Sequence, residues 1–589
     1  MTAPGPARRR FGPAAEWTFI VLAAVGCWLY ARANLSVDST GMGLWNSDGA
    51  SPVMLANDRN WDLYRLFYYG QDRFGTWPFF ALHLLRARWT PETMSGALSF
   101  FLLAGVLPAA ALGGRFRLAA ATGYLVGVFA PSVRQIVFDL PQVYPWQLPS
   151  LFASWACLRW MWARPPAWGR WGLAMVAASL TTWLVPWSAE VLMVLGMVEG
   201  ARAEGLTGPR RWAWAAAPGG VALAFEWSLR TLYHHVSSQR FGRPMQTLVR
   251  IDRGHLLEST RQSIRVLAGV EAAIPFAVVA LVMALVAVRW FRAGLTSPRT
   301  LWTVAGAGAA AMMPLPLFVL FTHFRLNDYE LRYFVPTMVL SIWGTGLLAA
   351  FLLERCAGTL GRVVPPVLAL GALGLLLPTS ARRPGFAAQR EFALRLASTG
   401  ASPLLLNSYW GTYVYEALAP TLRTLPLEGQ SDRLPWREAE LAHETTVLVG
   451  SRSPLPETPA TWIFQYGVLL TLEHPGVLSS ADENVSLYRR VPRREVPSTG
   501  TSREISIPPT LSPELYVAIG CEALPADTRA ELVLEDGHIE SARMEAGPRV
   551  VRVQRTGSGA RVQGFRLLGQ AWSRCGLGKA HVLETGPGT

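Results

Sequence analysis

Apolar runs of about twenty residues recur through positions 1–380, and each is long enough to cross a bilayer as a helix. In addition, 51% of all residues are hydrophobic and the mean hydropathy is +0.24, which excludes a soluble globule. We predict an α-helical polytopic membrane protein with about eleven transmembrane helices. Pro186 either separates the fifth and sixth spans or bends them into one hairpin. The predicted spans are 17–33, 94–112, 118–133, 146–162, 171–185, 188–200, 212–232, 271–288, 301–321, 334–353 and 364–377.

The formal charge of +14 does not indicate a nucleic-acid partner. Lys579 is the only lysine, so nearly all of the basic charge is arginine, and no basic soluble domain bearing aromatic residues is visible. Arginine at the edges of a membrane is the simpler explanation.

Arginines also orient the chain. They precede the first span and crowd alternate short loops, which by the positive-inside rule face the cytoplasm. The loop 34–93 and everything after position 380 then lie outside, as expected for a multi-pass protein of the bacterial cytoplasmic (inner) membrane with a periplasmic carboxy-terminal region. Arg382 and Arg383 run against this bias. The arginines that agree with the positive-inside rule are Arg8, Arg9, Arg10, Arg115, Arg117, Arg164, Arg170, Arg202, Arg210, Arg211, Arg289, Arg292, Arg299, Arg355 and Arg362.

The external tail is predicted to form two domains beyond the transmembrane module of residues 1–380. Short apolar runs alternate with helix-compatible stretches in 381–496, which favours an α/β domain. After a linker rich in Pro, Ser and Thr at 497–509, alternating apolar residues favour a β-sandwich in 505–589. Expected strands include 403–406, 445–449, 485–488, 515–519, 530–534, 549–553 and 565–568.

Two cysteines, Cys521 and Cys575, fall in this tail. An oxidising compartment would allow a disulfide between them, and two buried thiols are the alternative. No cysteine or histidine spacing resembles a zinc site, so we assign no metal ligand.

The loop 34–93 is longer than an ordinary connector and rich in Asp, Arg, Trp and Tyr, which suggests a reaction centre beside lipid. Asp48 precedes Gly49 in a predicted turn, and Pro52 is expected to open an interfacial helix over 53–69. An accessible carboxylate there is suited to general-base chemistry. Asp58, Asp62 and Asp72 are alternative candidates for this role. For each of these aspartates, a purely structural role in a turn or as a helix cap is the other possibility.

An early Asp in the first external loop, many spans and an external carboxy-terminal domain resemble the GT-C superfamily of integral-membrane glycosyltransferases. The stretches FTHFRLNDYELRYFVP at 321–336 and LNSYWGTYVY at 406–415 are also similar to members of that family. The resemblance implies a polyprenyl-phosphate or polyprenyl-diphosphate sugar as donor, membrane lipid around the enzyme, and a glycan, lipid or protein as acceptor.

The resemblance also implies roles for single residues. Asp48 corresponds to the catalytic acid of the first loop, although Ser47 and Gly49 stand where many relatives have paired acids, so a divalent metal stays open. Asp139 corresponds to a second carboxylate, with a salt bridge to Arg134 or a turn before Pro141 as the alternatives.

Arginine suits the donor phosphate because its planar fork donates paired hydrogen bonds to phosphate oxygens. Arg332, at the external end of a late span, is one candidate, and Arg250 and Arg253 are two more in the basic loop 233–270. A basic surface attracted to anionic lipid is the alternative for that loop. Other polar candidates are His234, His235, His323, Glu190, Glu226, Arg240, Arg243, Arg261 and Arg265.

The predicted function is therefore sugar transfer from a lipid-linked donor at the external face of the membrane. A transporter or flippase for lipid-linked saccharides is the main alternative, but it predicts paired inverted repeats, which are not apparent. A membrane-anchored envelope assembly protein is the third, and it leaves the elaborate first loop unexplained.

Overall fold

The computed structural model of the chain divides into two compact units, Met1–Ala388 and Gln389–Thr589. Arg250, Arg253, His323, Cys521 and Cys575 lie outside the residues that the structure describes. Those residues are 12–34, 47–58, 63–67, 74–85, 88–139, 143–162, 168–203, 208–241, 254–293, 298–315, 330–358, 360–377, 387–400, 404–408, 411–427, 435–451, 459, 462–466, 468–480, 483–491, 493–496, 499–500, 504–510, 514–519, 528–547, 550–554, 561–568 and 577–583.

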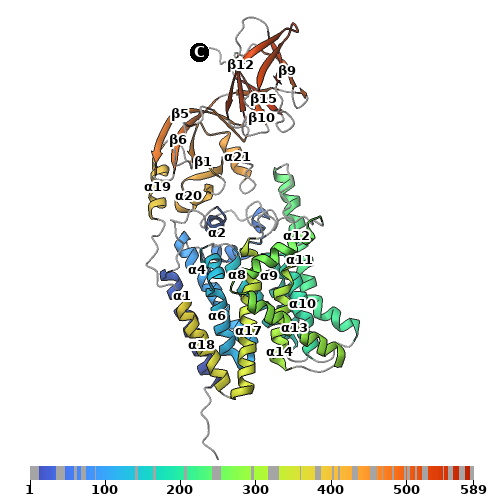
Figure 1. Ribbon diagram of the computed structural model, residues 1–589. Helices are drawn as coiled ribbons and strands as arrows, with labels where there is room; N and C mark the ends of the chain where they lie inside the picture. The colour runs from blue at the N-terminus through green and yellow to red at the C-terminus, as the bar shows by residue number, and fades with distance from the viewer. Residues whose placement is uncertain are drawn as a thin grey trace, which may run out of the picture. The chain divides into compact units, whose positions relative to one another are not determined.

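Long apolar helices run side by side in the first unit, which confirms the predicted helical membrane fold (Figure 1). Four helical stretches in the described ranges have the length and hydropathy to cross a membrane, and the count of eleven spans stays a prediction. The elements are α1 (Pro13–Asn34), α2 (Ser47–Asn57), η1 (Leu63–Leu66), α3 (Trp77–Leu84), α4 (Pro91–Ala104), α5 (Val106–Gly113), η2 (Gly114–Phe116), α6 (Arg117–Phe129), α7 (Pro131–Asp139), α8 (Tyr144–Trp162), α9 (Trp168–Leu184), α10 (Ser188–Arg202), α11 (Pro209–Phe241), α12 (Leu256–Ala268), α13 (Ala273–Ala293), α14 (Arg299–Met312), η3 (Leu331–Phe334), α17 (Val335–Ala357) and α18 (Leu360–Leu376).

Aromatic side chains from α6, α8 and α17 form the centre of this unit. Trp155 and Trp343 are fully buried and their rings lie 5.4 Å apart, while Phe152 contacts both Trp343 and Tyr124 at 5.2 Å. Edge-to-face packing of such large side chains adds to the burial of apolar area, so these three helices form a rigid middle for the bundle.

Arginines gather at one end of the bundle. In the turn between α5 and α6, Arg115 pairs with Glu354 at the end of α17 at 2.7 Å, and Arg117 pairs with Glu16 at the start of α1 at 3.1 Å. The amino end of α1, the α5–α6 turn and the carboxyl end of α17 therefore meet at one end.

A buried ion cluster extends this arginine-rich end to α8, α10 and α14. Glu199 is 1% exposed, accepts hydrogen bonds from Arg159 at 2.7 Å and from the indole of Trp155 at 2.8 Å, and forms an ion pair with Arg202 at 2.8 Å. Arg159 also donates to Thr303 of α14 at 2.8 Å. An apolar interior tolerates a charged glutamate only when it is paired in this way, so the cluster ties three helix ends together.

The second unit begins with α19 (Ala387–Ser398) and a six-stranded mixed sheet. Its strand order is β2-β1-β3-β6-β5-β4, with β1 parallel to β2 and β3 and the other pairs antiparallel. The elements are β1 (Leu404–Asn407), α20 (Thr412–Leu418), β2 (Arg423–Pro426), α21 (Pro435–Leu441), β3 (Thr446–Ser451), β4 (Trp462–Gln465), β5 (Val468–Ser479) and β6 (Asn484–Arg490).

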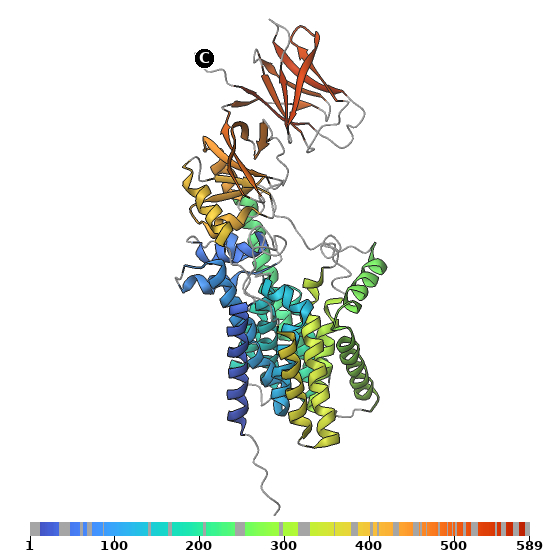
Figure 2. The same ribbon diagram turned by 60° about the vertical axis from the view of Figure 1, so that its left-hand side comes forward.

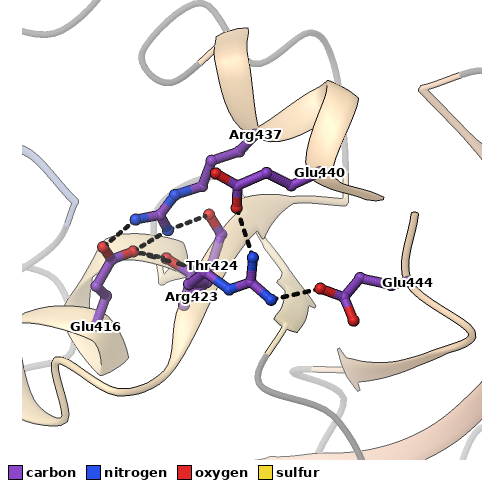
Figure 3. A network of polar contacts seen from close by, with 6 residues as sticks. All are labelled: Glu416, Arg423, Thr424, Arg437, Glu440 and Glu444. Carbon is purple, nitrogen blue, oxygen red and sulfur yellow. Dashed lines mark hydrogen bonds and ion pairs between the residues drawn. The ribbon is translucent and has the colours of Figure 1, made fainter. Parts of the chain in front are cut away.

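Figure 3 shows how α20, α21 and β2 are held together. Arg437 of α21 makes a bidentate ion pair with Glu416 of α20, whose carboxylate also accepts from the Thr424 hydroxyl at 2.9 Å. Burial disfavours the guanidinium charge, but Glu416 outweighs that cost and raises the pKa of Arg437. Arg423 is more exposed and pairs with Glu440 at 2.8 Å.

The remaining strands form a nine-stranded antiparallel sheet that bends at β12. Positions 539–542 of β12 pair with β11 and positions 543–547 pair with β13, so one long strand belongs to both halves. Residues of β9, β10, β11, β13 and β14 share one apolar core. Strands β8 and β9 begin inside the predicted linker 497–509. The strands are β7 (Arg493–Val496), β8 (Thr499–Gly500), β9 (Glu504–Thr510), β10 (Glu514–Ile519), β11 (Arg529–Leu534), β12 (Ile539–Gly547), β13 (Val550–Gln554), β14 (Val562–Leu568) and β15 (Leu577–Leu583).

Candidate functional site

The candidate site lies at the end of the bundle opposite the arginine-rich end. Because α8, α10 and α17 each have their carboxyl ends at the arginine-rich end, the start of α8, the α9–α10 turn and η3 lie at the other end. Phe74 of the first loop contacts Tyr144 at the start of α8 (6.1 Å) and Trp187 before α10 (5.9 Å). Most of the residues predicted to be functional belong to elements at this end.

The first loop is bound to the end of α9 by its backbone. The Trp183 indole donates to the Leu66 carbonyl at 2.9 Å, and the Gly75 amide donates to the Leu184 carbonyl at 3.2 Å. Phe67 and Gly75 form a short antiparallel bridge between the two sides of the loop. These bonds give the loop a fixed place on the membrane unit.

Gly75 is the closest point of this contact. A Cβ added there would lie 2.3 Å from the Trp183 carbonyl oxygen, a distance that no side chain tolerates. Only glycine allows the loop to approach α9 so closely, and no local pattern in the sequence predicts this contact.

Asp48 lies in the first turn of α2, whereas the sequence predicted that it would lie in a turn ahead of the helix. The helix begins at Ser47 and contains Pro52 in its interior. Proline has no amide hydrogen, so it cannot donate to the carbonyl of Asp48 one turn earlier. The Asp48 side chain is outside the described residues, and its catalytic role stays a prediction.

The predicted interfacial helix over 53–69 also differs from the structure. Helix α2 ends at Asn57, whose side chain accepts from the Trp89 amide at 2.9 Å and donates to its carbonyl at 2.7 Å. Residues 50–55 are all buried, so α2 packs into protein. Beyond it, Arg65 is buried and pairs with Asp58 at 2.5 Å, which assigns Asp58 a structural partner.

Asp139 is the last residue of α7, and its side chain is likewise outside the described residues. Glu271, in the turn between α12 and α13, caps the first turn of α7 by accepting from the Ser132 amide at 2.8 Å and hydroxyl at 2.7 Å. Arg134 donates to the Leu376 carbonyl at the end of α18 at 2.7 Å. Helix α7 is therefore held at two points along its length.

Arg332 lies in η3, directly before α17. Its side chain is buried, its guanidinium lies 5.2 Å from the Tyr333 ring centre, and its Nε pairs with the half-exposed Glu330. Elements α7 and α12 both contact η3, so the structure brings the helix of Asp139 beside the turn of Arg332. Helix α2, with Asp48, packs on α3 and α4 at the same end.

Two acidic residues lie inside apolar helices near this end. Glu226 is buried and pairs with Arg230 one turn later on α11 at 2.5 Å. Glu190, in the first turn of α10, is close enough to Glu226 for the two charges to interact. Tyr233, three residues after Arg230 on α11, packs against Phe67 of the first loop with ring centres 5.1 Å apart, so this helix also supports the loop.

The described residues contain no group of three or more His, Cys, Asp or Glu side chains placed to hold a metal ion. Asp48 and Asp139 are not among the side chains described. Arg261 and Arg265 both lie on the exposed side of α12, and Arg265 donates to Gln262 at 3.1 Å. His234 packs edge-on against Tyr233 at 5.7 Å.

Comparison with solved structures gives the fold. ArnT from Cupriavidus metallidurans bound to undecaprenyl phosphate aligns with a TM-score of 0.50 at 13% identity, covering 81% of this chain and 98% of ArnT. An Archaeoglobus fulgidus oligosaccharyltransferase in complex with Zn and sulfate aligns with a TM-score of 0.43 at 9% identity, covering 96% and 98%. No protein-family model and no curated protein sequence matches the chain. The likeness to ArnT shows a shared fold.

Proposed function

We propose that this chain, which has the GT-C fold of ArnT, is a membrane glycosyltransferase that uses a polyprenyl-phosphate or polyprenyl-diphosphate sugar. The single observation that supports this most is the fold itself, because it extends over nearly the whole of ArnT, a protein solved with undecaprenyl phosphate bound. The gathering of α2, α7 and η3 at one end of the bundle agrees with it.

The orientation follows from the arginine-rich end. By the positive-inside rule we propose that this end faces the cytoplasm of a bacterium and that α2, α7 and η3 lie at the external side of its inner membrane. The region after position 380 is proposed to be periplasmic because it follows the last predicted span. A lipid-linked sugar presents its phosphate at that external surface while its chain stays in the bilayer.

The proposed chemistry is an in-line displacement at the anomeric carbon. The acceptor oxygen or nitrogen forms a bond to that carbon as the bond to the phosphate oxygen breaks, and the acceptor proton passes to a carboxylate. Asp48 takes that proton, and Asp139 orients the acceptor. Arg332 stabilises the negative charge that grows on the departing phosphate, which competes with Glu330 for the guanidinium. Arg250 and Arg253 are proposed as further phosphate ligands.

The direct test uses the full-length protein in nanodiscs with a panel of synthetic polyprenyl-phosphate and polyprenyl-diphosphate sugars. Release of free polyprenyl phosphate from the phosphate donors, or of polyprenyl diphosphate from the diphosphate donors, together with a glycosylated product detected by mass spectrometry, would support the proposal. Comparing surface glycans and lipid-linked intermediates of a deletion strain with the parent would identify the acceptor. If every donor stays intact while the protein moves lipid-linked saccharide across the proteoliposome membrane, the transporter hypothesis is correct.

A further inference from the structure

We infer that α12 is a lipid-binding helix whose outer face lies among the headgroups of anionic phospholipids. Two serines are buried on one side of this helix, while large apolar side chains are exposed on the other. The buried positions are Ser259, Ser263 and Leu267, at helical spacing on one side. The outward side carries Leu257, which is 85% exposed, and Ile264, which is 57% exposed.

Two arginines share this outward side. Arg261 and Arg265 are four residues apart, so both side chains leave the helix next to Leu257 and Ile264. Glu258 is the only acid within α12, and it contacts His255 at 3.2 Å. Apolar side chains flanked by arginines suit the boundary between acyl chains and phosphates, where a water-facing helix would carry polar residues.

The position of α12 puts this face at the membrane surface. Only residues 269–272 separate it from α13, a helix long and apolar enough to span a membrane. Ile274 is 77% exposed on α13 and Leu281 is 60% exposed, as expected for side chains that face lipid. Four residues reach at most about 14 Å, so the carboxyl end of α12 must stay close to the headgroup layer at the end of α13. Figure 2 shows the short helix α12 following α11 at the end of the bundle away from the α17–α18 turn.

The helix is also joined to the candidate site. It contacts η3, which carries Arg332, and the turn that follows it supplies the Glu271 cap of α7. Binding of lipid to α12 would therefore steady both elements. The inference itself does not depend on sugar transfer, because it concerns only what covers this face.

The test compares amide hydrogen exchange of α12 in the full-length protein in two kinds of nanodisc, phosphatidylcholine alone and phosphatidylcholine with phosphatidylglycerol. Each arginine near an anionic surface contributes roughly fivefold in affinity, so α12 should exchange more than about tenfold more slowly in the anionic discs. High salt should remove the difference. The double variant Arg261→Gln/Arg265→Gln should lose it as well.

A matched control removes two exposed arginines from the nine-stranded sheet, in the variant Arg529→Gln/Arg543→Gln, and should keep the full difference. The variant Leu257→Asn/Ile264→Asn tests the apolar half and should exchange faster in both lipids. The inference is overturned if wild-type α12 exchanges equally in the two lipids, or if the Arg261→Gln/Arg265→Gln protein keeps the effect. Protection that depends on protein concentration would instead indicate a second copy of the chain on this face.

Discussion

Glu271 accepts two hydrogen bonds from Ser132, one from the backbone amide at 2.8 Å and one from the hydroxyl at 2.7 Å. This contact joins the turn before α13 to the start of α7, the helix that ends in Asp139. A carboxylate at a helix amino terminus also interacts favourably with the helix dipole and so stabilises the helix. The position of Asp139 therefore depends on a residue more than a hundred positions away in the chain.

Replacing Glu271 by alanine should loosen α7 at a cost of about 1 kcal/mol, the usual value for a lost cap. We expect kcat for sugar transfer to fall by roughly tenfold, because misplacing a catalytic group by a fraction of an ångström has effects of this size. Steady-state kinetics with the active donor would measure it. Glu535→Ala, in an exposed turn of the nine-stranded sheet, should leave kcat unchanged.

Gly75→Ala should displace the first loop. The new methyl group would meet the Trp183 carbonyl at 2.3 Å, so either the loop or the end of α9 must move. We expect activity to fall by at least tenfold and the midpoint of thermal unfolding to drop. Gly96→Ala, in α4, meets nothing within 4 Å and should be neutral or slightly stabilising. Equal activity and equal unfolding midpoints in the two alanine variants would show that the contact between Gly75 and Trp183 is not needed for activity or stability.

The Arg332 prediction compares two arginines at opposite ends of α17. Arg332→Lys loses the planar fork and should raise the donor KM by about tenfold or more, with a smaller loss of kcat. Arg355 also stacks on a ring, Phe351 at 4.8 Å, but lies at the arginine-rich end. Arg355→Lys should leave KM within twofold of wild type, and a similar rise in both variants would contradict the assignment of Arg332.

Arg437 of α21 and Arg423 of β2, beside each other in Figure 3, should differ in their contribution to stability. Arg437→Gln leaves the nearly buried Glu416 without its bidentate partner, which should cost about 3 kcal/mol. Arg423→Gln breaks more exposed pairs and should cost less than about 1 kcal/mol. Hydrogen exchange of β2 in the full-length protein reports both values. Similar exchange in the two variants would show that burial does not set the strength of these pairs.

Local patterns in the sequence were enough to find most elements but not their contacts. The alternation in 515–519 and 530–534 matches β10 and β11, because half-buried strands show a period of two. The predicted span 94–112 lies within the apolar helical stretch Pro91–Phe129, in which Gly105 joins α4 to α5 with a helical backbone. A Cβ at Gly105 would meet the Tyr124 hydroxyl, and because that contact comes from another helix, no local pattern predicts it.

The same limit applies to the candidate site. Proline favours the first position of a helix, so the sequence predicts a helix that begins at Pro52, but α2 begins at Ser47 and includes Asp48 in its first turn. The docking of Gly75 on Trp183 and the Glu271 cap of α7 also join distant parts of the chain. The sequence could identify Asp48, Asp139 and Arg332 as candidates, but it could not say what holds their elements in place.

The most direct test of the central claim is sugar transfer by purified Asp48→Asn protein in nanodiscs, with the donor that the wild-type protein uses. Asparagine keeps the size of the side chain but accepts no proton, so we expect at least a thousandfold loss of kcat with an unchanged unfolding midpoint and donor affinity. Asp536→Asn, in an exposed turn of the second unit, should transfer sugar at the wild-type rate. Full activity in the Asp48→Asn protein would contradict the account.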